Sequence, residues 1–415
     1  MEDKIKLKKE AGCIVFLGGM NAMPMMYALE LKTLGYEVLY IVDAPASNTL
    51  SRPENHFKDI AYPYPKWIIE YQLKSQMLLP IFRAFFATNL KKKIFKKCSK
   101  VQAVFFNGFF TSLIPAFNDC QNRIALSHGS DLDSWADLEG REKLSNHFYK
   151  QSFFKYLPKN LAKYLIKKVV NNQYQGFLNA ERVIYFPQGF NANGDRVLNS
   201  LTKKGVKCLE RYDASFEPLK EQKRGINENP GKLVIFSGVR FTFKTFTEGN
   251  DGYSKGNDMM IEGLAKFYKN YPNIEIHFVE KGPDVGIAKS LINTLGLEKA
   301  VIWHKEMKFL DLLRLYKKSD ICFDQVGKHW IGAIGFYALW LGKPLIANDE
   351  LPVQLGVWPK DNPILSANTG DAVFKALVTL AEDGVRQEYS VQSMDFAERY
   401  LSPQKLMDQL FDYEF

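Results

Sequence analysis

The sequence contains no run of about 20 consecutive apolar residues, the length that a helix needs to cross a bilayer. Its first residues, MEDKIKLKKE, lack the apolar core and the small-residue cleavage site of a secretory signal peptide. Both absences argue against a membrane-spanning or exported protein. With 46% hydrophobic and 24% charged residues, the composition is typical of a globular protein, and we predict a cytoplasmic location.

Cysteine and histidine are also scarce, and neither shows a metal-ligand pattern. The five cysteines are Cys13, Cys98, Cys120, Cys208 and Cys322. Their odd number and wide spacing argue against a disulfide framework, and no C-x-x-C pair indicates a thiolate zinc site. The isolated histidines are His56, His147, His277 and His304. The sequence therefore predicts reduced thiols, no bound metal and no cofactor.

Positive charge is in excess, with a formal net charge of +9, which favours anionic partners. Residues 66–100 carry many lysines against one acid, Glu70, and residues 150–168 carry lysines and no acid. The second stretch interleaves its lysines with Phe153, Phe154, Tyr156 and Tyr164.

The first basic stretch has the spacing of an amphipathic helix. The apolar positions are Leu79, Phe82, Phe86, Leu90 and Ile94. A basic helix of this kind binds an anionic membrane surface, although a domain helix with a solvated lysine face gives the same pattern. No nucleic-acid motif is present, so we predict a membrane surface and no nucleic acid as the anionic partner.

Strand-like apolar runs alternate with helical segments along the whole chain, which predicts parallel sheets joined by crossover helices. Strands are expected at 12–17, 36–42, 101–106, 123–127, 182–186, 232–237, 273–279, 299–303, 320–324 and 343–347. At 415 residues, the chain is long enough for more than one domain. We predict an α/β fold of two facing Rossmann-like domains, with a ligand cleft at the carboxyl ends of their strands.

The predicted boundaries follow the composition. Residues 1–215 form the acceptor-side domain and the polar residues 216–231 form a linker. Residues 232–390 form the donor domain, and residues 391–415 form a helical segment.

The loop after the first strand of the second half carries a cation pair. Arg240 follows this strand, and Lys255 stands at the start of the next helix. Two cations beside the free amides of a helix N-terminus are typical of a diphosphate site. A surface loop with incidental charges is the alternative.

Several ordered motifs extend this pattern. A strand ends in a glycine loop at Gly282, a helix ends in LGL, and a strand VIW and a Y-x-x-x-D motif follow. The motif residues that come next are Asp324, Gln325, Gly332, Gly335 and the run Gly342, Lys343, Pro344. Over residues 232–350 this order resembles the donor domain of GT-B glycosyltransferases, especially family four.

The resemblance implies roles for single residues. Arg240 and Lys255 match the cations that neutralise the leaving diphosphate of a nucleotide-sugar donor, a task that needs no metal ion. Gly282 matches the loop near the nucleobase. Gly332 and Gly335 match the loop whose backbone amides meet the sugar or phosphate.

The chain departs from the family at the ribose site. Tyr337 and His329 occupy the positions of the two glutamates of the family, the first of which grips the ribose hydroxyls. The ribose is then held differently, for which Asp324 and Glu350 are candidates, or the donor is unusual.

In the first half, LSHGSDLD (126–133) follows a strand and offers His128 and Asp131. His128 resembles the family histidine that reaches the transferred sugar, and Asp131 could act as a general base in an inverting reaction. A turn in which Ser130 or Asp131 caps the next helix is the alternative.

The loop FLGGMNAM (16–23) is the second candidate ligand loop of the first half. Gly18 and Gly19 allow a ligand to approach the backbone, and Asn21 could cap the next helix. The loop is not G-x-G-x-x-G, so a nicotinamide cofactor is not expected. Tight-turn glycines without a ligand are the alternative.

These observations predict a metal-independent, retaining glycosyltransferase at the inner face of the cell membrane. Its acceptor would be a glycan or lipid-linked glycan of cell-surface polysaccharide, such as capsule or lipopolysaccharide. Two alternatives stay open, a nucleotide-sugar epimerase and a non-catalytic glycosyltransferase-like subunit that has lost its ribose carboxylates.

Overall fold

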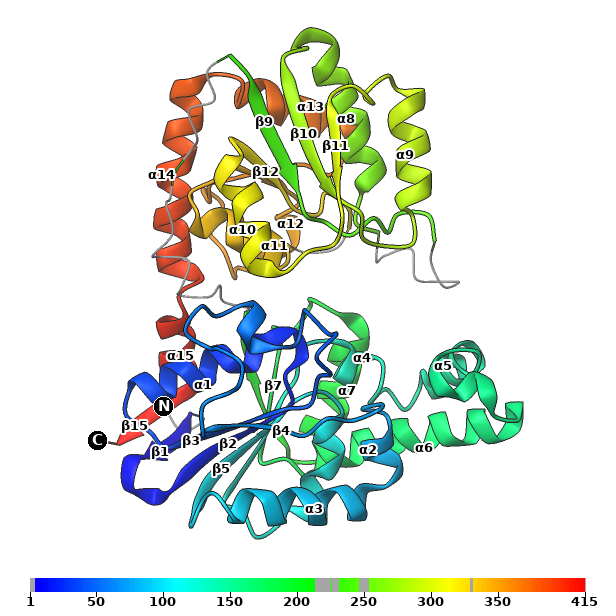
Figure 1. Cartoon of the computed structure of the whole chain (residues 1–415), viewed down its shortest axis with the longest axis vertical. Coiled ribbons are helices and arrows are strands. Elements are labelled where there is room, and N and C mark those ends of the chain that lie inside the picture. Colours follow the sequence, from blue (N-terminus) through cyan, green and yellow to red (C-terminus); the bar gives the residue numbers. More distant parts are fainter. Residues whose placement is uncertain (1–3, 213–224, 226–230, 246–253, 329–330, 415) are drawn as a thin grey trace. The chain divides into compact units, whose positions relative to one another are not determined.

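The structure is a computed structural model that describes residues 4–212, 225, 231–245, 254–328 and 331–414. The chain divides into two compact units. The first domain comprises Met1–Tyr212 and Leu406–Phe415, and the second comprises Asp213–Lys405 (Figure 1). Most of the predicted linker, 216–231, lies outside the described residues.

The first domain is built on a parallel sheet whose seven described strands run in the order β4-β3-β2-β5-β6-β7-β8. The strands are β2 (Cys13–Leu17), β3 (Val38–Val42), β4 (Ile68–Glu70), β5 (Val101–Phe106), β6 (Asn122–Leu126), β7 (Arg182–Tyr185) and β8 (Lys207–Glu210). The central strands β2 and β3 are buried along their whole length, as expected of strands covered on both faces.

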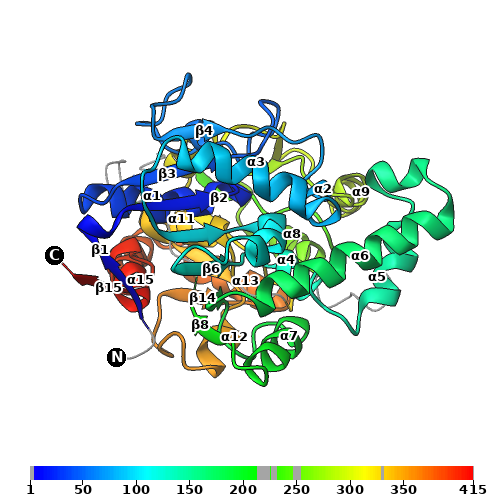
Figure 2. The same cartoon turned by 90° about the horizontal axis from the view of Figure 1, so that it is seen from below.

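The connections of the first domain are helical. The α-helices are α1 (Met23–Thr33), α2 (Leu78–Ile81), α3 (Arg83–Phe95), α4 (Ser130–Asp133), α5 (Arg141–Phe148), α6 (Lys159–Leu178), α7 (Ala192–Thr202) and α15 (Pro403–Leu410). The 3-10 segments are η1 (Lys9–Ala11), η2 (Met20–Ala22), η3 (Pro53–Asn55), η4 (Gly108–Ala116) and η5 (Ser152–Tyr156). Helix α5 and the first half of α6 extend beyond the sheet of this domain (Figure 2).

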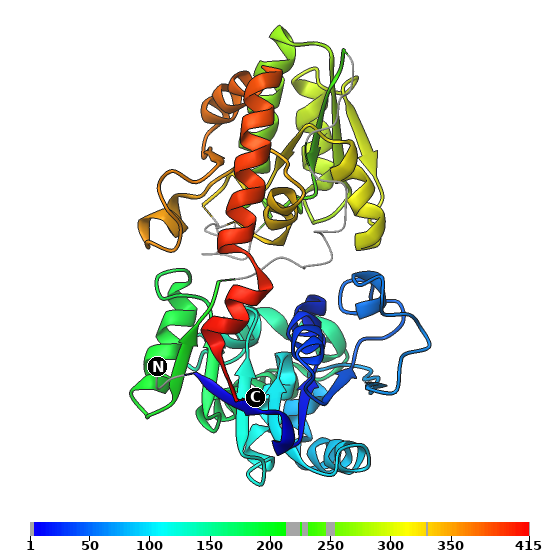
Figure 3. The same ribbon diagram turned by 90° about the vertical axis from the view of Figure 1, so that its left-hand side faces the viewer.

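The two ends of the chain pair with each other. Strand β1 (Ile5–Lys8) runs parallel to β15 (Phe411–Glu414), with Ile5 opposite Phe411 (Figure 3). The expectation that residues 391–415 form a helical segment is therefore wrong for the last residues, since Phe411–Glu414 form a strand. Phe411 is buried and stacks against Tyr413, which explains why these four residues form a strand.

The second domain repeats the design with a parallel sheet whose six described strands run β11-β10-β9-β12-β13-β14. The strands are β9 (Leu233–Ser237), β10 (Ile274–Val279), β11 (Val301–His304), β12 (Ile321–Phe323), β13 (Leu345–Ala347) and β14 (Ile364–Ser366). The helices are α8 (Asn257–Asn270), α9 (Val285–Thr294), α10 (Phe309–Lys318), α11 (Ala333–Trp340), α12 (Glu350–Gln354), α13 (Gly370–Thr379) and α14 (Asp383–Tyr400).

The apolar core of the second domain shows why these helices form layers. Buried residues of α8, α9 and α13 pack with Ile235, Ile276 and Ile321 of the sheet, so one face is covered by these helices. Helices α10 and α11 contact the sheet at β9, β12 and β13, and α14 packs on α11. Burial of apolar side chains on both faces is the main stabilisation of such a layered domain.

In both sheets the strand order reverses beside the first strand of the βα pattern. The reversal lies between β2 and β5 in the first domain and between β9 and β12 in the second. Loops at the carboxyl ends of these strand pairs form the usual ligand site of a doubly wound sheet.

The fold class predicted from the sequence is confirmed, as is each of the ten strands expected from the apolar runs. The sequence analysis missed β1, β4, β8, β14 and β15. None of these is buried along its whole length, so each mixes polar with apolar residues and gives no continuous apolar run.

The expected amphipathic helix is wrong in one respect. The chain breaks at Phe82 into α2 and α3, and Leu79, Leu90 and Ile94 are fully buried. These three positions of the stripe therefore pack inside the domain, where α2 and α3 contact η4 and α2 contacts α6, whereas Phe82 is exposed. Among the described residues, no helix is both long and apolar enough to pass through a bilayer.

Several aromatic side chains lie on the surface of this region. Phe82, Phe85 and Phe95 are 56%, 64% and 46% exposed, and four lysines of the 91–97 run are exposed beside them. Tyr156 and Tyr164 are also exposed, on η5 and α6. The domain thus presents basic and aromatic surface, formed by Phe82 of the periodic stripe and by side chains outside the stripe.

Candidate functional site

Arg240 and Lys255 lie at the carboxyl edge of the second-domain sheet. Arg240 is exposed, three residues beyond the end of β9, and Lys255 is half-buried beside Gly256, the N-cap of α8. The backbone of Lys255 donates to Thr242 O (2.9 Å) and accepts from Val326 N (3.2 Å). These bonds connect the start of α8 with the loops that follow β9 and β12.

The electrostatics of Lys255 reflect its neighbours. Burial lowers its pKa to about 8, the charge of Asp324 opposes this shift, and the positive charge of Arg240 adds to it. The two cations therefore act on each other. Such a pair is energetically costly without an anion and favourable beside one.

Glycine is required where the Lys255 segment meets the loop after β12. Gly256 has a φ of +69°, and a Cβ atom there would lie 2.4 Å from the backbone N of Gly327. A Cβ atom on Gly327 would lie 2.2 Å from Ser254 O. The close contact of these two backbones, which only glycine permits, brings Lys255 toward the carboxyl end of β12.

Asp284, just before α9, holds the loop that carries Arg240. Its Oδ2 atom accepts from the backbone N–H groups of Phe243, Lys244 and Thr245 at 2.6, 2.8 and 3.1 Å. Burial opposes ionisation, but these bonds and that from the Thr245 hydroxyl lower the pKa of Asp284. A carboxylate that accepts several amide bonds makes a loop rigid.

Gly282 packs the β10–α9 loop against the Arg240 loop. It has a φ of +111°, and a Cβ atom there would lie 2.3 Å from Phe241 O and 2.7 Å from Cγ of Arg240. The structure thus brings Gly282 and Arg240 together, as the donor-site prediction requires. Its role at a nucleobase stays a prediction.

Asp324 fixes the start of α11. Its Oδ2 atom accepts from Gly332 N (2.7 Å) and Gly335 N (3.0 Å), and its Oδ1 atom accepts from Gln325 N (2.8 Å). A Cβ atom on Gly335 would lie 2.8 Å from Oδ2, so glycine is needed for this contact. Burial raises the pKa of Asp324 to about 6, although the amide bonds oppose the shift.

These contacts argue against the expectation that Asp324 binds the ribose of the donor. Asp324 is 1% exposed and both of its oxygens bind backbone amides, so it cannot also grip a ribose diol. Its bonds fix Gln325 and the start of α11 at Gly332 and Gly335. Glu350 is exposed, but its Oε1 atom accepts from Asn368 Nδ2 (2.6 Å).

Tyr337, at the position of the family glutamate, belongs to the core. It is 7% exposed and its ring packs 4.5 Å from Phe309 and 6.4 Å from Tyr316. The hydroxyl of Tyr316 donates to Ile334 O (2.8 Å), which fixes the same helix. His329, at the other glutamate position, lies outside the described residues.

In the first domain, Asn107 joins three loops at the carboxyl edge. Its Oδ1 atom accepts from Met20 N (3.1 Å), which lies after β2. Its Nδ2 atom lies 2.7 Å from O of Leu126, the last residue of β6, and 2.7 Å from Nδ1 of His128, which follows β6. Since both amide hydrogens are used, Nδ1 of His128 is the acceptor and its Nε2 carries the proton.

His128 is held in this neutral state. Burial, together with the positive charge of Arg211, lowers its pKa well below the usual value. Its Nε2 atom has no hydrogen-bond partner among the described residues. The structure thus leaves a buried, oriented N–H group that the described residues do not satisfy.

Asp131 lies behind His128. It is 1% exposed, and its Oδ1 atom accepts from the Ser127 hydroxyl (2.7 Å) and from His128 N (3.2 Å). Burial raises its pKa to about 6. In the described part of the chain its Oδ2 atom has no partner, and no side-chain cap is made to α4. Through these two hydrogen bonds, Asp131 holds the loop that carries His128 in place.

The glycine loop after β2 is filled by the protein itself. A Cβ atom on Gly18 would lie 2.9 Å from Asn107 O, and one on Gly19 would lie 2.9 Å from Ser51 O. The amide of Gly19 donates to Asp43 Oδ1 (3.1 Å). Both glycines are therefore required by neighbouring backbone, and their ligand role stays a prediction.

The expected cap at Asn21 is wrong. Helix α1 has Ala22 at its N-cap and no side-chain cap, while Asn21 takes a positive φ of 52° and donates its amide to the Ser51 hydroxyl (3.2 Å). The tight turn after Gly19 puts the backbone of Asn21, and not its side chain, at the loop contact.

Sequence reasoning missed the residues that position the site. Asn107 follows β5 directly, and a polar residue at that place was a usable signal. Asp284, Gly256 and Gly327 gave no such signal, because their role depends on contacts between loops distant in sequence.

Comparison with known proteins identifies the fold of this chain but no sequence family. No protein-family model matches this chain, and no curated protein sequence matches it. Sucrose-phosphate synthase from Thermosynechococcus elongatus matches over 96% of both chains, with 12% identity and a TM-score of 0.58. HepE from Anabaena, in complex with UDP and glucose, matches over 96% of this chain and 98% of its own, with 13% identity and a TM-score of 0.59.

A third structure agrees. WaaG, a glycosyltransferase involved in lipopolysaccharide biosynthesis, matches over 96% of this chain and 99% of its own, with 14% identity and a TM-score of 0.53. At such identities the similarity establishes the fold alone. The chain has the two Rossmann-like α/β domains of the GT-B architecture.

Proposed function

We propose that this protein transfers a sugar from a nucleoside-diphosphate sugar to a glycan or lipid-linked glycan acceptor. The observation that carries the proposal is the interacting pair Arg240 and Lys255 beside the N-terminus of α8. A helix N-terminus with two adjacent cations suits a diphosphate. The resemblance of residues 232–350 to family-four donor domains supports the same assignment.

The cation pair would act on the leaving group. In the transfer, the acceptor oxygen bonds to the anomeric carbon, the bond from this carbon to the diphosphate breaks, and the electron pair stays on the diphosphate oxygen. Arg240 and Lys255 would stabilise that charge without a metal ion. In a retaining reaction the acceptor proton passes to the departing oxygen on the same face, so no protein base is required.

His128 would contribute from the first domain. Its Nε2–H group, oriented by Asn107, can donate to a hydroxyl of the transferred sugar. Asp131 is too buried to serve as a base, and we assign it to positioning His128. Gly18 and Gly19 would border the same site.

The solved neighbours support a nucleotide donor and a glycan product. HepE was solved with UDP-glucose as well as with UDP and glucose, and WaaG is described as acting in lipopolysaccharide biosynthesis. We extend this to a uridine nucleotide sugar as the first donor to test and to cell-surface polysaccharide as the product class.

We also propose that the protein works at the inner face of the cell membrane. Phe82, Phe85 and Phe95 are exposed beside the lysines of α3, and Tyr156 and Tyr164 are exposed beside those of η5 and α6. Lysines near an anionic surface and aromatic rings at its interface favour binding. This location suits a lipid-linked acceptor.

Thermal unfolding with a panel of nucleoside diphosphates and nucleotide sugars tests the proposal. A ligand at about 100 times its Kd adds about 2.7 kcal/mol to the free energy of unfolding. We expect stabilisation by one nucleotide series, equal with Mg²⁺ and with a chelator, and absent in Arg240→Ala. The absence of stabilisation by every nucleotide would reject the donor site.

One observation favours a second candidate, a non-catalytic glycosyltransferase-like subunit. Tyr337 is packed in the core and Asp324 is used by backbone amides, so neither serves the ribose. Such a subunit would bind a protein or glycan partner. It predicts stable copurification with that partner and no affinity for any nucleotide, the reverse of the first proposal.

A further inference from the structure

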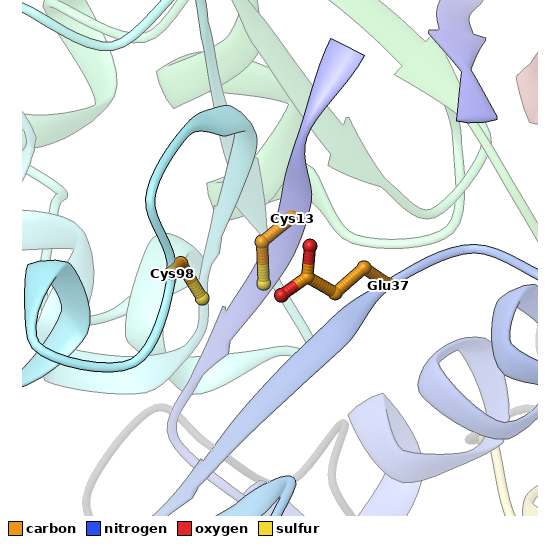
Figure 4. A group of neighbouring side chains, drawn as sticks. All are labelled: Cys13, Glu37 and Cys98. Atoms are coloured by element: carbon orange, nitrogen blue, oxygen red, sulfur yellow. The ribbon is translucent and has the colours of Figure 1, made fainter. Parts of the chain in front are cut away.

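Two cysteines that are 85 positions apart in the sequence meet at the amino edge of the first-domain sheet. Cys13 begins β2, and Cys98 lies in the turn between α3 and β5. The carboxylate of Glu37, directly before β3, points toward the same place (Figure 4). One ligand atom from each of the three residues lies within 4.8 Å of the other two.

The sheet itself sets this arrangement. Cys13 pairs with Val101 of β5, and Ile14 pairs with Val38 of β3. The amide of Cys13 donates to Lys100 O (2.9 Å), and the amide of Ile14 donates to Glu37 O (2.8 Å). Hydrogen bonds of the sheet thus hold the three backbone segments side by side. This pairing alone brings the three side chains together.

Glycine makes the contact possible on one side. Gly12 has a φ of +125°, and a Cβ atom there would lie 2.8 Å from Lys100 O. The segment before β2 can therefore approach the turn that carries Cys98. Cys13 and Cys98 are 1% and 2% exposed, whereas Glu37 is exposed. The group is closed on the sulfur side and open on the carboxylate side.

We propose that Cys13, Cys98 and Glu37 form a binding site for one zinc ion. Two sulfur ligands select a thiophilic cation over Mg²⁺ or Ca²⁺, which prefer oxygen ligands. Zinc takes sulfur and carboxylate ligands together, in four-coordinate sites. Three ligands come from the protein, and water completes the coordination on the open side.

The position in the fold assigns the ion a structural role. The site lies at the amino edge of the sheet, opposite the carboxyl edge that carries His128. A bound ion would join the starts of β2 and β3 to the α3–β5 turn. It would take no part in sugar transfer, so the proposal stands whether or not the proposed function does.

Cobalt titration tests the site, since Co²⁺ bound by thiolate gives a charge-transfer band that Mg²⁺ and oxygen-only sites do not. We expect the reduced, chelator-treated protein to develop this band with one equivalent of Co²⁺. Zn²⁺ should displace the Co²⁺ and raise the Tm, while Mg²⁺ should do neither. The absence of a band in the reduced wild type would overturn the proposal.

Variants assign the ligands. Cys13→Ser and Cys98→Ser should each lose the band. Glu37→Gln changes an exposed residue, so it should fold normally and bind Zn²⁺ at least about tenfold more weakly. Cys120→Ser, which changes a buried cysteine of the same domain outside the group, should bind as the wild type does.

Two results would contradict the assignment. The first is wild-type Zn²⁺ affinity in both Cys98→Ser and Glu37→Gln. The second is a Cys13–Cys98 disulfide, seen as the loss of two hydrogens in the mass of metal-free protein purified without chelator. That result would make the pair an oxidised cross-link and not a metal site.

Discussion

The Nδ2 atom of Asn107 lies 2.7 Å from the Nδ1 atom of His128, and this contact determines which ring nitrogen carries the proton. The orientation of the amide is set on its other side, where Oδ1 accepts from Met20 N. A residue after β5 thus prepares the N–H donor of a residue after β6. Because β5 and β6 are neighbours in the sheet, Asn107 can orient the His128 ring for the hydrogen bond to the sugar that we propose.

Asn107→Asp should reverse this arrangement. A carboxylate opposite Nδ1 would accept a proton from it, so Nε2 would become an acceptor and lose its donor function. We expect kcat for sugar transfer to fall about 100-fold, as when one oriented donor is removed from an active site. Nucleotide binding should not change, because the donor diphosphate is assigned to the second domain.

The matched control for this prediction is Asn172→Asp, which adds a carboxylate to α6 where Asn172 donates to Pro80 O. Circular dichroism should show both variants folded. Wild-type kcat in Asn107→Asp would remove His128 from the mechanism.

Arg240→Ala and Lys255→Ala should each lower kcat by about 100-fold or more, since each removes a charge that stabilises the leaving diphosphate. Lys244→Ala is the control. It changes an exposed lysine of the same loop, whose side chain pairs with Asp258 at 3.3 Å. Steady-state kinetics with a nucleotide-sugar donor decide the question, and equal turnover in all three variants would reject the assignment.

The pH dependence of nucleotide binding should report Lys255. Its pKa is lowered to about 8, mainly by burial and also by the charge of Arg240, while the charge of Asp324 opposes the shift. A bound diphosphate favours the charged amine and raises this pKa, so binding takes up a proton. Affinity should therefore be highest below pH about 8 and fall by up to about tenfold per pH unit above it.

Isothermal titration calorimetry in buffers of different ionisation enthalpy measures this proton uptake directly. Lys255→Met should bind more weakly and show a flat profile over the same range. Proton release on binding, or an unchanged slope in Lys255→Met, would assign the effect to another group.

Apolar runs were sufficient to predict the sheets of both domains, because buried parallel strands must be apolar throughout. That fold in turn predicted which loops lie at the carboxyl edges of the sheets. It also predicted that Arg240, Lys255 and His128 lie on those loops. What their side chains do depends on partners, and that part could not be predicted. Asp324 illustrates this, because its Oδ2 atom binds amides at the start of a helix that begins nine residues later.

The cysteine pair shows the same limit. Spacing along the chain gave no metal pattern, since Cys13 and Cys98 are brought together only by the pairing of β2 with β5. Likewise, helical spacing identified the buried positions Leu79, Leu90 and Ile94, but it also included Phe82, which is exposed. It could not tell whether the apolar stripe packs on the domain or on a membrane, because both surfaces are apolar.

Asp131→Asn should change how stability depends on pH. Burial raises the pKa of Asp131 from 3.8 to about 6 in the folded state. The favourable contribution of this group is therefore complete below pH about 4 and is lost as pH rises through about 6. From pH about 4 to about 7, the stability difference should shift by about 3 kcal/mol in favour of the variant.

Urea unfolding at both pH values measures this difference. Asp119→Asn is a control of opposite sign, because the bond from Lys91 lowers the pKa of Asp119 even though burial opposes it. Parallel pH profiles of the wild type and Asp131→Asn would mean that Asp131 does not titrate as its burial implies.

Membrane binding should depend on four exposed lysines on and directly after α3. These are Lys92, Lys93, Lys96 and Lys97. Lys91 is excluded because it pairs with Asp119 at 2.6 Å. Each lysine near an anionic surface contributes about 1 kcal/mol, so changing all four to Gln should weaken binding to phosphatidylserine vesicles about a thousandfold.

The control for this prediction changes four exposed lysines of the second domain to Gln. These are Lys269, Lys299, Lys308 and Lys375. Vesicle sedimentation should show normal binding in the control. Equal loss in both variants would indicate an effect of net charge alone, and no binding by the wild type would end the membrane hypothesis.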